Sequence, residues 1–205
     1  MRTPLLLAGL LAITACSAAA PEQSSAEAAT GERAVAVVAT GCFWCTESDF
    51  DKVPGVLRTT SGYIGGKIPN PSYKQVSAGG SGHIEALQIV YDPGKVSYAT
   101  LVRHALRTSD PTDGGGQFCD RGSQYRPAIF VGNPAERRVA EAAKAEAGRV
   151  LSRPIATDIL PRTRFYPAED YHQDYHTKNP IRYRYYRLSC GRDARVREVW
   201  KSASR

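Results

Sequence analysis

The stretch that decides the fold runs from residue 34 to residue 45 and reads AVAVVATGCFWC. Its first half, Ala34 to Ala39, is an unbroken run of small and β-branched apolar residues, which predicts a buried strand. Thr46 to Asp51 carries acids in its first turn and predicts a short helix. Cys42 therefore stands where a strand passes into a helix N-terminus. Free backbone N–H groups and the helix dipole at such a point are expected to lower the pKa of the thiol.

Two aromatic residues, Phe43 and Trp44, follow Cys42 directly and are expected to surround its sulfur with apolar surface. A thiolate beside an aromatic box suits a small, neutral, partly apolar substrate. Residues 41–45 alone are equally compatible with a buried structural cysteine or with half of a zinc site.

The chain has 205 residues, which fits one domain with a substantial core. Residues 1–16 combine a positive start, an apolar run too short to span a bilayer, and Ile13-Thr14-Ala15-Cys16, the order of a bacterial lipobox. We predict a lipoprotein signal peptide over 1–16 with Cys16 as the lipidation site, an ordinary secretory signal being the alternative. Residues 17–32 predict a disordered tether and 33–205 the folded domain. The protein is then exported to the periplasm or cell envelope and anchored to a membrane.

The net charge of +7 is concentrated near the C-terminus, where residues 162–205 hold 11 basic and 5 acidic side chains. A basic tail can contact nucleic acid, an anionic membrane or an acidic protein. For an exported protein no nucleic-acid partner is expected, and a solvated tail over the domain is the favoured interpretation.

Without Cys16, four cysteines remain: Cys42, Cys45, Cys119 and Cys190. In an oxidising compartment they allow two structural disulfides. A domain of this size needs no such crosslinks, however, and a Cys-x-x-Cys pair at a strand-to-helix turn indicates redox chemistry or metal binding.

The remaining sequence predicts alternating strands and helices. Strands are expected at 56–64, 84–91, 128–131 and 155–160, and helices after Ser97 and from Asn133 to about Val150. Residues 108–126 form a long Gly-rich loop, and loops of that length are usually functional. The order predicts an α+β fold: a mixed sheet with helices on one side, a ferredoxin-like two-layer sandwich with long loops and an irregular C-terminal tail from Phe165.

Eight short motifs follow one another in a fixed order. They are Gly41-Cys42-Phe43-Trp44; Gly62-Tyr63 with Gly65-Gly66; Asn70-Pro71; Gly82-His83-x-Glu85-Ala86; Tyr91-Asp92-Pro93; Asp120-Arg121-Gly122-x-x-Tyr125-Arg126; Phe165-Tyr166-x-Ala168-Glu169-Asp170-Tyr171-His172-Gln173; and Lys178-Asn179-Pro180. In identity and order this set resembles the class A peptide methionine sulfoxide reductases, over about Val35 to Gly191.

The resemblance implies a reaction and a role for each matching residue. Cys42 matches the nucleophile that attacks the sulfur of the S epimer of methionine sulfoxide, free or in oxidised proteins. Glu85 matches the proton donor, a role that a raised carboxyl pKa serves. Further matches are two hydrogen-bonding tyrosines, Tyr63 and Tyr125; an acidic residue near the substrate, Asp120; the methyl-binding aromatics Phe43 and Trp44; and His172, at the substrate site or structural. No cofactor, no metal and a monomer are expected.

The resemblance also implies that Cys42 becomes a sulfenic acid, condenses with a second thiol, and is recycled by a thioredoxin-like reductant. Many family members carry recycling cysteines in a Gly-rich tail after Asn-Pro, whereas this chain reads IRYRYY at 181–186. Cys45 stands where many members have glycine. Cys190, Cys45 and Cys119 all stay open as the resolving thiol.

Two other classes compete with this interpretation. A zinc module would use Cys42 and Cys45 with two ligands from the set Cys119, Cys190, His172 and His176. A thiol–disulfide oxidoreductase would use the Cys42-x-x-Cys45 pair directly, but only one predicted strand precedes Cys42 and no proline loop stands opposite it.

Overall fold

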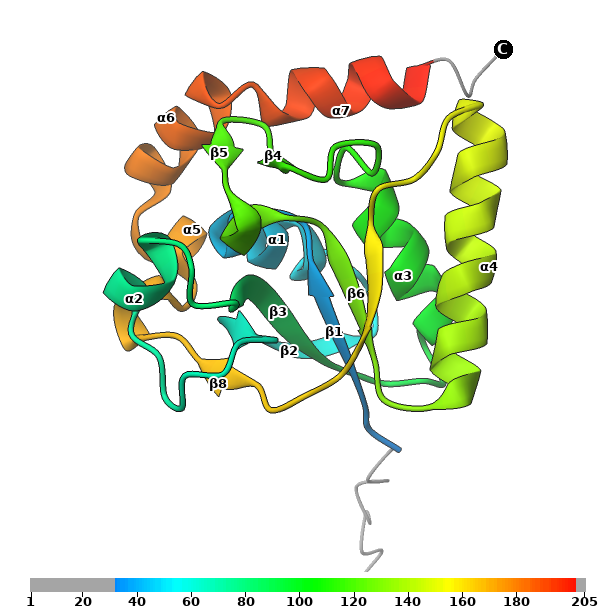
Figure 1. The fold of residues 1–205 in the computed structure, drawn as a ribbon, viewed down its shortest axis with the longest axis horizontal. Helices are drawn as coiled ribbons and strands as arrows, with labels where there is room; N and C mark the ends of the chain where they lie inside the picture. The colour runs from blue at the N-terminus through cyan, green and yellow to red at the C-terminus, as the bar shows by residue number, and fades with distance from the viewer. Residues whose placement is uncertain (1–31, 202–205) are drawn as a thin grey trace, which may run out of the picture. The chain divides into compact units, whose positions relative to one another are not determined.

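The computed structural model describes residues 32–201, and their main element is a six-stranded sheet of order β7-β6-β1-β3-β2-β8 (Figure 1). Its strands are β1 (Ala34–Ala39), β2 (Val56–Ile64), β3 (Ile84–Tyr91), β6 (Ala128–Val131), β7 (Asp158–Pro161) and β8 (Tyr166–Pro167). Only the β6–β7 pair in this sheet is parallel. The mixed sheet of the predicted α+β fold is therefore confirmed.

Three helices cover one face of the sheet: α1 (Phe43–Phe50), α3 (Tyr98–Arg107) and α4 (Pro134–Leu151). Alternate residues of β1 point to opposite faces. Ala36 and Val38 pack with Phe50 of α1 and Leu101 of α3. Val37 and Ala39 instead belong to a cluster on the other face that contains no helical residue. Helices on one side, as expected, thus form the second layer.

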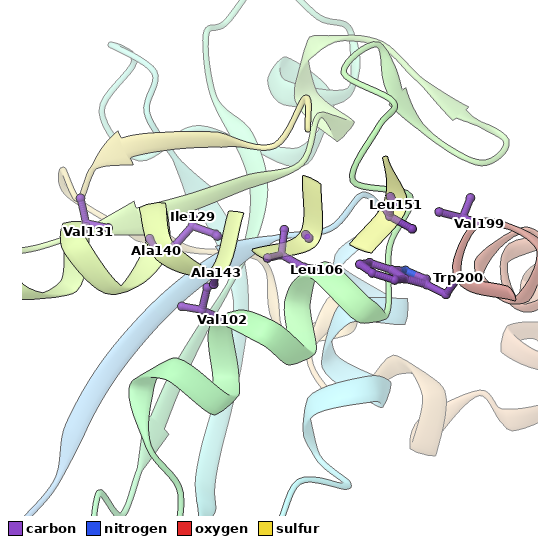
Figure 2. Close-up of a cluster of buried hydrophobic side chains, with 10 residues drawn as sticks. Val102, Leu106, Ile129, Val131, Ala140, Ala143, Leu151, Val199 and Trp200 are labelled. Carbon is purple, nitrogen blue, oxygen red and sulfur yellow. The ribbon is translucent and has the colours of Figure 1, made fainter. Parts of the chain in front are cut away.

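A second part of the helical layer is built where α3 and α4 meet β6. Figure 2 shows Val102 and Leu106 of α3 facing Ala140 and Ala143 of α4, with Trp200 at one end of the cluster. The alanines of α4 allow this helix to pack closely against α3.

The predicted helix caps are present in the structure. The Ser97 hydroxyl accepts from the Thr100 N–H at 3.1 Å, and Asn133 Oδ1 accepts from the Glu136 N–H at 2.9 Å. Both bonds satisfy first-turn donors that a helix cannot pair internally. A further short helix, α2 (Tyr73–Ser77), was not predicted, and it lies in the loop between β2 and β3.

The C-terminal region differs from the expected irregular tail, because it contains α5 (Tyr175–Lys178), α6 (Pro180–Ser189) and α7 (Arg192–Lys201). These helices have no clear apolar stripe, since the groups that they bury include charged ones. Arg192 is 2 % exposed, and its guanidinium donates to the Thr40 carbonyl at 3.0 Å and to the Thr108 carbonyl at 2.9 Å. Hydrophobic periodicity therefore could not identify them.

The described residues all fall within one unit, Gly31–Arg205. The predicted signal peptide, its Cys16 and nearly all of the predicted tether lie outside the described residues. Within residues 32–201, no helix combines the length and the apolar character needed to cross a membrane.

Candidate active site

Cys42 is the N-cap residue of α1, with non-helical backbone angles (φ −50°, ψ 122°). Its carbonyl accepts from the N–H groups of Cys45 at 3.1 Å and Thr46 at 3.2 Å, so it begins the helix. Gly41 precedes it at φ +92°, and a Cβ at this position would lie 2.6 Å from Gln117 Cβ. Only glycine fits this turn, which delivers the Cys42 side chain to the end of the helix.

The Cys42 side chain is buried, at 7 % exposure. Burial raises the pKa of the Cys42 thiol well above its usual range, and contact with Cys45 and the nearby Glu85 and Asp120 carboxyls add to this. The lowered thiol pKa expected from the helix N-terminus was therefore wrong for the resting structure, because loss of solvent outweighs the helix dipole.

Glu85 lies on β3 opposite Tyr63 of β2 and is only 2 % exposed. The Phe43 N–H donates to Glu85 Oε2 at 3.1 Å, which joins the carboxyl to the first turn of α1. Burial raises the pKa of Glu85 to about 8, against the opposing effect of this hydrogen bond. Glu85 is thus protonated at neutral pH and can act as a proton donor.

Both groups open into one small cavity of about 70 Å³. It is lined by Cys42, Phe43, Trp44, Tyr73, Glu85, Asp120, Tyr125 and Tyr186. Six of these eight are residues that the sequence proposed for the site. The other two, Tyr73 of α2 and Tyr186 of α6, were missed.

Two residues proposed from the sequence support the cavity wall instead of lining it. The Tyr63 hydroxyl donates to Glu169 Oε2 at 3.0 Å, and its ring lies 5.9 Å from that of Phe43. His172 Nδ1 accepts from the Trp44 indole N–H at 3.0 Å, and burial lowers the pKa of this histidine. A neutral His172 therefore fixes the orientation of Trp44.

Glu169 is a further residue that the sequence did not single out, although it lies within the quoted motif 165–173. Besides Tyr63, its carboxylate accepts from the Tyr73 N–H at 2.8 Å. It thereby joins β2 to α2 beneath the cavity. Spacing offered one usable signal for α2, since Ser72 and Gln75 form a capping box.

The polar side of the cavity consists of hydroxyls and Asp120. Asp120 lies on β5 (Asp120–Arg121), which pairs with β4 (Gly116–Gln117), and its Oδ2 accepts from the Tyr186 hydroxyl. Tyr125 ends a 3₁₀ turn, Ser123–Tyr125, and hydrogen-bonds with Tyr73. Burial raises the pKa of Tyr73, Tyr125 and Tyr186, so all three keep their protons.

The four cysteines form two pairs. Cys45 is buried and in side-chain contact with Cys42, and both are free thiols. Cys119 and Cys190 form a disulfide with a Cα–Cα distance of 5.0 Å, in which Cys119 is exposed. Over residues 32–201, metal-ligating atoms cluster at Cys119, Asp120 and Cys190; two of these are candidates for the zinc module, but they are joined in the disulfide and no such cluster includes Cys42 or Cys45.

Such a site defines a class of protein: a reductase that works through a cysteine sulfur and protonates the oxygen that it removes. Comparison with known proteins agrees, since residues 34–204 match the family model described as peptide methionine sulfoxide reductase. The chain belongs to the peptide methionine sulfoxide reductase family and is an oxidoreductase of its A class.

Individual relatives support this assignment. Peptide methionine sulfoxide reductase MsrA 2 of Caulobacter vibrioides is 47 % identical over 203 residues, which cover 97 % of this chain and 98 % of the relative. The crystal structure of Mxr1 from Saccharomyces cerevisiae in reduced form is 34 % identical, with a TM-score of 0.70 over 73 % of this chain and 87 % of that one. Mxr1 in complex with Trx2 is 25 % identical, with a TM-score of 0.52 over 70 % and 85 %.

Proposed function

We propose that this protein reduces the S epimer of methionine sulfoxide to methionine, in oxidised proteins and as the free amino acid, with Cys42 as the nucleophile. The observation that carries the proposal is that the Cys42 sulfur and the protonated Glu85 carboxyl line the same small cavity. Reduction of a sulfoxide needs both groups, a nucleophile that attacks the sulfur and an acid that protonates the oxygen.

The first half-reaction transfers one oxygen atom. The Cys42 thiolate attacks the sulfoxide sulfur while Glu85 gives its proton to the oxygen. The oxygen then passes to Cys42: its S–O bond forms while the substrate's S–O bond and the transient bond between the two sulfurs break, leaving a Cys42 sulfenic acid and a thioether. The proton lost from Cys42 balances the proton given by Glu85. Cys42 is oxidised by two electrons and the substrate is reduced by two.

The other cavity residues supply binding and charge stabilisation. Phe43 and Trp44 provide apolar surface for the S-methyl group. Tyr125 and Tyr73 keep their protons and can donate to the developing negative oxygen. Tyr63 and His172 do not line the cavity but support Phe43 and Trp44, which form its aromatic wall.

A relay through Cys190 and Cys119 is the recycling path that the disulfide supports best. Cys190 attacks the sulfenic acid, water leaves, and a Cys42–Cys190 disulfide forms. Cys119 then displaces Cys42, giving the Cys119–Cys190 disulfide of this structure with Cys42 free. Because Cys119 is exposed and Cys45 is buried, an external dithiol reaches the first pair more readily.

Mass mapping tests this order, starting from fully reduced protein and one equivalent of sulfoxide peptide. The relay predicts a Cys119–Cys190 disulfide and, in a variant lacking both thiols of this pair, a dimedone adduct on Cys42. A Cys42–Cys45 disulfide in the native chain would make Cys45 the resolving thiol. If none of the peptide were reduced to its methionine form, the function itself would be rejected.

The reductant that we propose is a thioredoxin-like dithiol protein, since the related Mxr1 has been crystallised in complex with Trx2. The proposal also includes export of the protein and lipidation at Cys16. The lipobox order Ile13 to Cys16 supports a lipid-anchored enzyme of the bacterial envelope, where the reductant must also be located.

A further inference from the structure

Tyr186 is the cavity residue that comes from the C-terminal helices. Its ring meets Trp44 edge-on, with centroids 5.8 Å apart. Its hydroxyl donates to Asp120 Oδ2 and is also within hydrogen-bonding reach of the Cys42 sulfur. We propose that Tyr186 is a catalytic residue whose hydroxyl stabilises the Cys42 thiolate, and that in the oxidised form described here the Cys119–Cys190 disulfide holds it in place. This rests on Cys42 as the nucleophile proposed above.

The titratable side chains around Cys42 come from six elements. They are Cys45 of α1, Tyr73 of α2, Glu85 of β3, Asp120 of β5, Tyr125 of the 3₁₀ turn and Tyr186 of α6. The carboxyls and Cys45 oppose a charge on Cys42. Tyr73 and Tyr125 are hydrogen-bonded to each other. Tyr186 therefore supplies the hydroxyl that directly contacts the sulfur.

A phenol has a single proton, so Tyr186 can serve only one of its two acceptors at a time. Burial raises the pKa of Asp120, which favours uptake of a proton by this carboxyl, and once it holds a proton it no longer competes for that of the phenol. The Tyr186 hydroxyl is then free to donate to a Cys42 thiolate. A hydrogen bond to a charged group favours the charged form, so this switch offsets part of the cost of ionising a buried thiol.

The disulfide joins the two segments that carry this hydrogen bond. Cys119 directly precedes Asp120, and Cys190 follows Tyr186 by one helical turn, its N–H donating to the Tyr186 carbonyl at 2.9 Å. Figure 1 shows α6 ending beside the β4–β5 ribbon, where the disulfide crosses between them. The bond therefore limits how far the Tyr186 hydroxyl can move from Asp120 and Cys42.

The test is the pH profile of Cys42 alkylation by iodoacetamide, read by fragment-ion mass spectrometry so that Cys45 is scored separately. The Tyr186→Phe variant keeps the ring and its packing on Trp44. Its alkylation midpoint should rise by about one pH unit, which makes labelling about tenfold slower below the midpoint. With a small dithiol as reductant, kcat should fall about tenfold while KM stays the same. Tyr185→Phe is the matched control, since its side chain is 75 % exposed on the same helix.

Two further variants separate the parts of the proposal. In an Asp120→Asn background, Tyr186→Phe should still shift the midpoint; no further shift there would mean that Tyr186 acts only through Asp120. A Cys119→Ser/Cys190→Ser double variant should move the midpoint upward, and an unchanged midpoint would refute the role of the disulfide. Coincident profiles for Tyr186→Phe and wild type would overturn the catalytic role. Because alkylation needs no sulfoxide, it stays informative even if the proposed turnover fails.

Discussion

Replacing Glu85 by glutamine should make the protein a poorer enzyme and a more stable one. The Glu85→Gln side chain has the same shape, and its amide oxygen can still accept from the Phe43 N–H. It has no transferable proton, so kcat should fall by roughly two orders of magnitude with substrate binding retained. The gain in stability follows from burial, because a neutral amide avoids the cost of keeping a carboxyl protonated at neutral pH.

The size of this gain depends on pH in a definite way. In the folded protein the pKa of Glu85 is raised to about 8 from an ordinary value of 4.5. Below pH 4.5 both the folded and the unfolded chain hold the proton, and the wild type loses nothing. Above it only the unfolded chain releases the proton, so each pH unit lowers the wild-type free energy of unfolding by about 1.4 kcal/mol. The loss reaches about 3 kcal/mol at pH 7 and levels off above about pH 8.

Urea unfolding of wild type and Glu85→Gln at pH 4.5, 5.5, 6.5 and 7.5 measures this difference. Glu141→Gln, which removes an exposed carboxyl on α4, is the control for a general effect of charge. The stability of Glu85→Gln relative to wild type should rise steadily over the series. A difference that is the same at pH 4.5 and 7.5 would show that Glu85 is already ionised in the folded protein and is not the proton donor.

Three other outcomes are expected. Cys42→Ser should abolish turnover, because a serine hydroxyl is neither ionised nor soft enough to attack sulfur; activity well above background would transfer the role to another cysteine. Assays with separated epimers of a sulfoxide peptide should show use of the S epimer alone, since the aromatic wall and Glu85 fix two substituents of a chiral sulfur, and equal use of both would contradict the assignment. The full-length protein should fractionate with membranes and Cys16→Ser should not; an unmodified N-terminus on a fully soluble wild type would argue for an ordinary secretory signal.

The elements predicted well from sequence are those with a strong local signal. The strand Ala34–Ala39 and the strand at 84–91 were found at their full length because both faces of each are buried in apolar surroundings. The helix from Asn133 was fixed by its cap and first-turn proline. By contrast, β7 was expected at 155–160 and occupies Asp158–Pro161, because its register is set by parallel pairing with β6 and not by its own residues.

The residues of the site also differ in whether the sequence could identify them. Cys42, Glu85 and Asp120 could be proposed because each stands in one of the ordered motifs that resemble the family, Cys42 and Glu85 at the ends of predicted strands and Asp120 in the predicted loop 108–126. Tyr186 could not, since it is one of several tyrosines in a segment without periodicity. Its place in the cavity depends on where α6 is held, which is a property of the tertiary structure.

Buried charge, rather than an apolar stripe, holds α6 and α7 against the active-site helix. The Asp49 carboxylate of α1 forms ion pairs with the guanidinium groups of Arg187 of α6, at an N–O distance of 2.9 Å, and Arg192 of α7, at 3.5 Å. All three side chains are largely or wholly buried. Such pairs form only once the domain is assembled, and breaking one would leave a charge unpaired in the interior. They bring Cys190 to Cys119 across 71 residues of sequence. Spacing alone left Cys190, Cys45 and Cys119 open as the resolving thiol, and the relay proposed above through Cys190 and Cys119 depends on an ion network that no sequence period records.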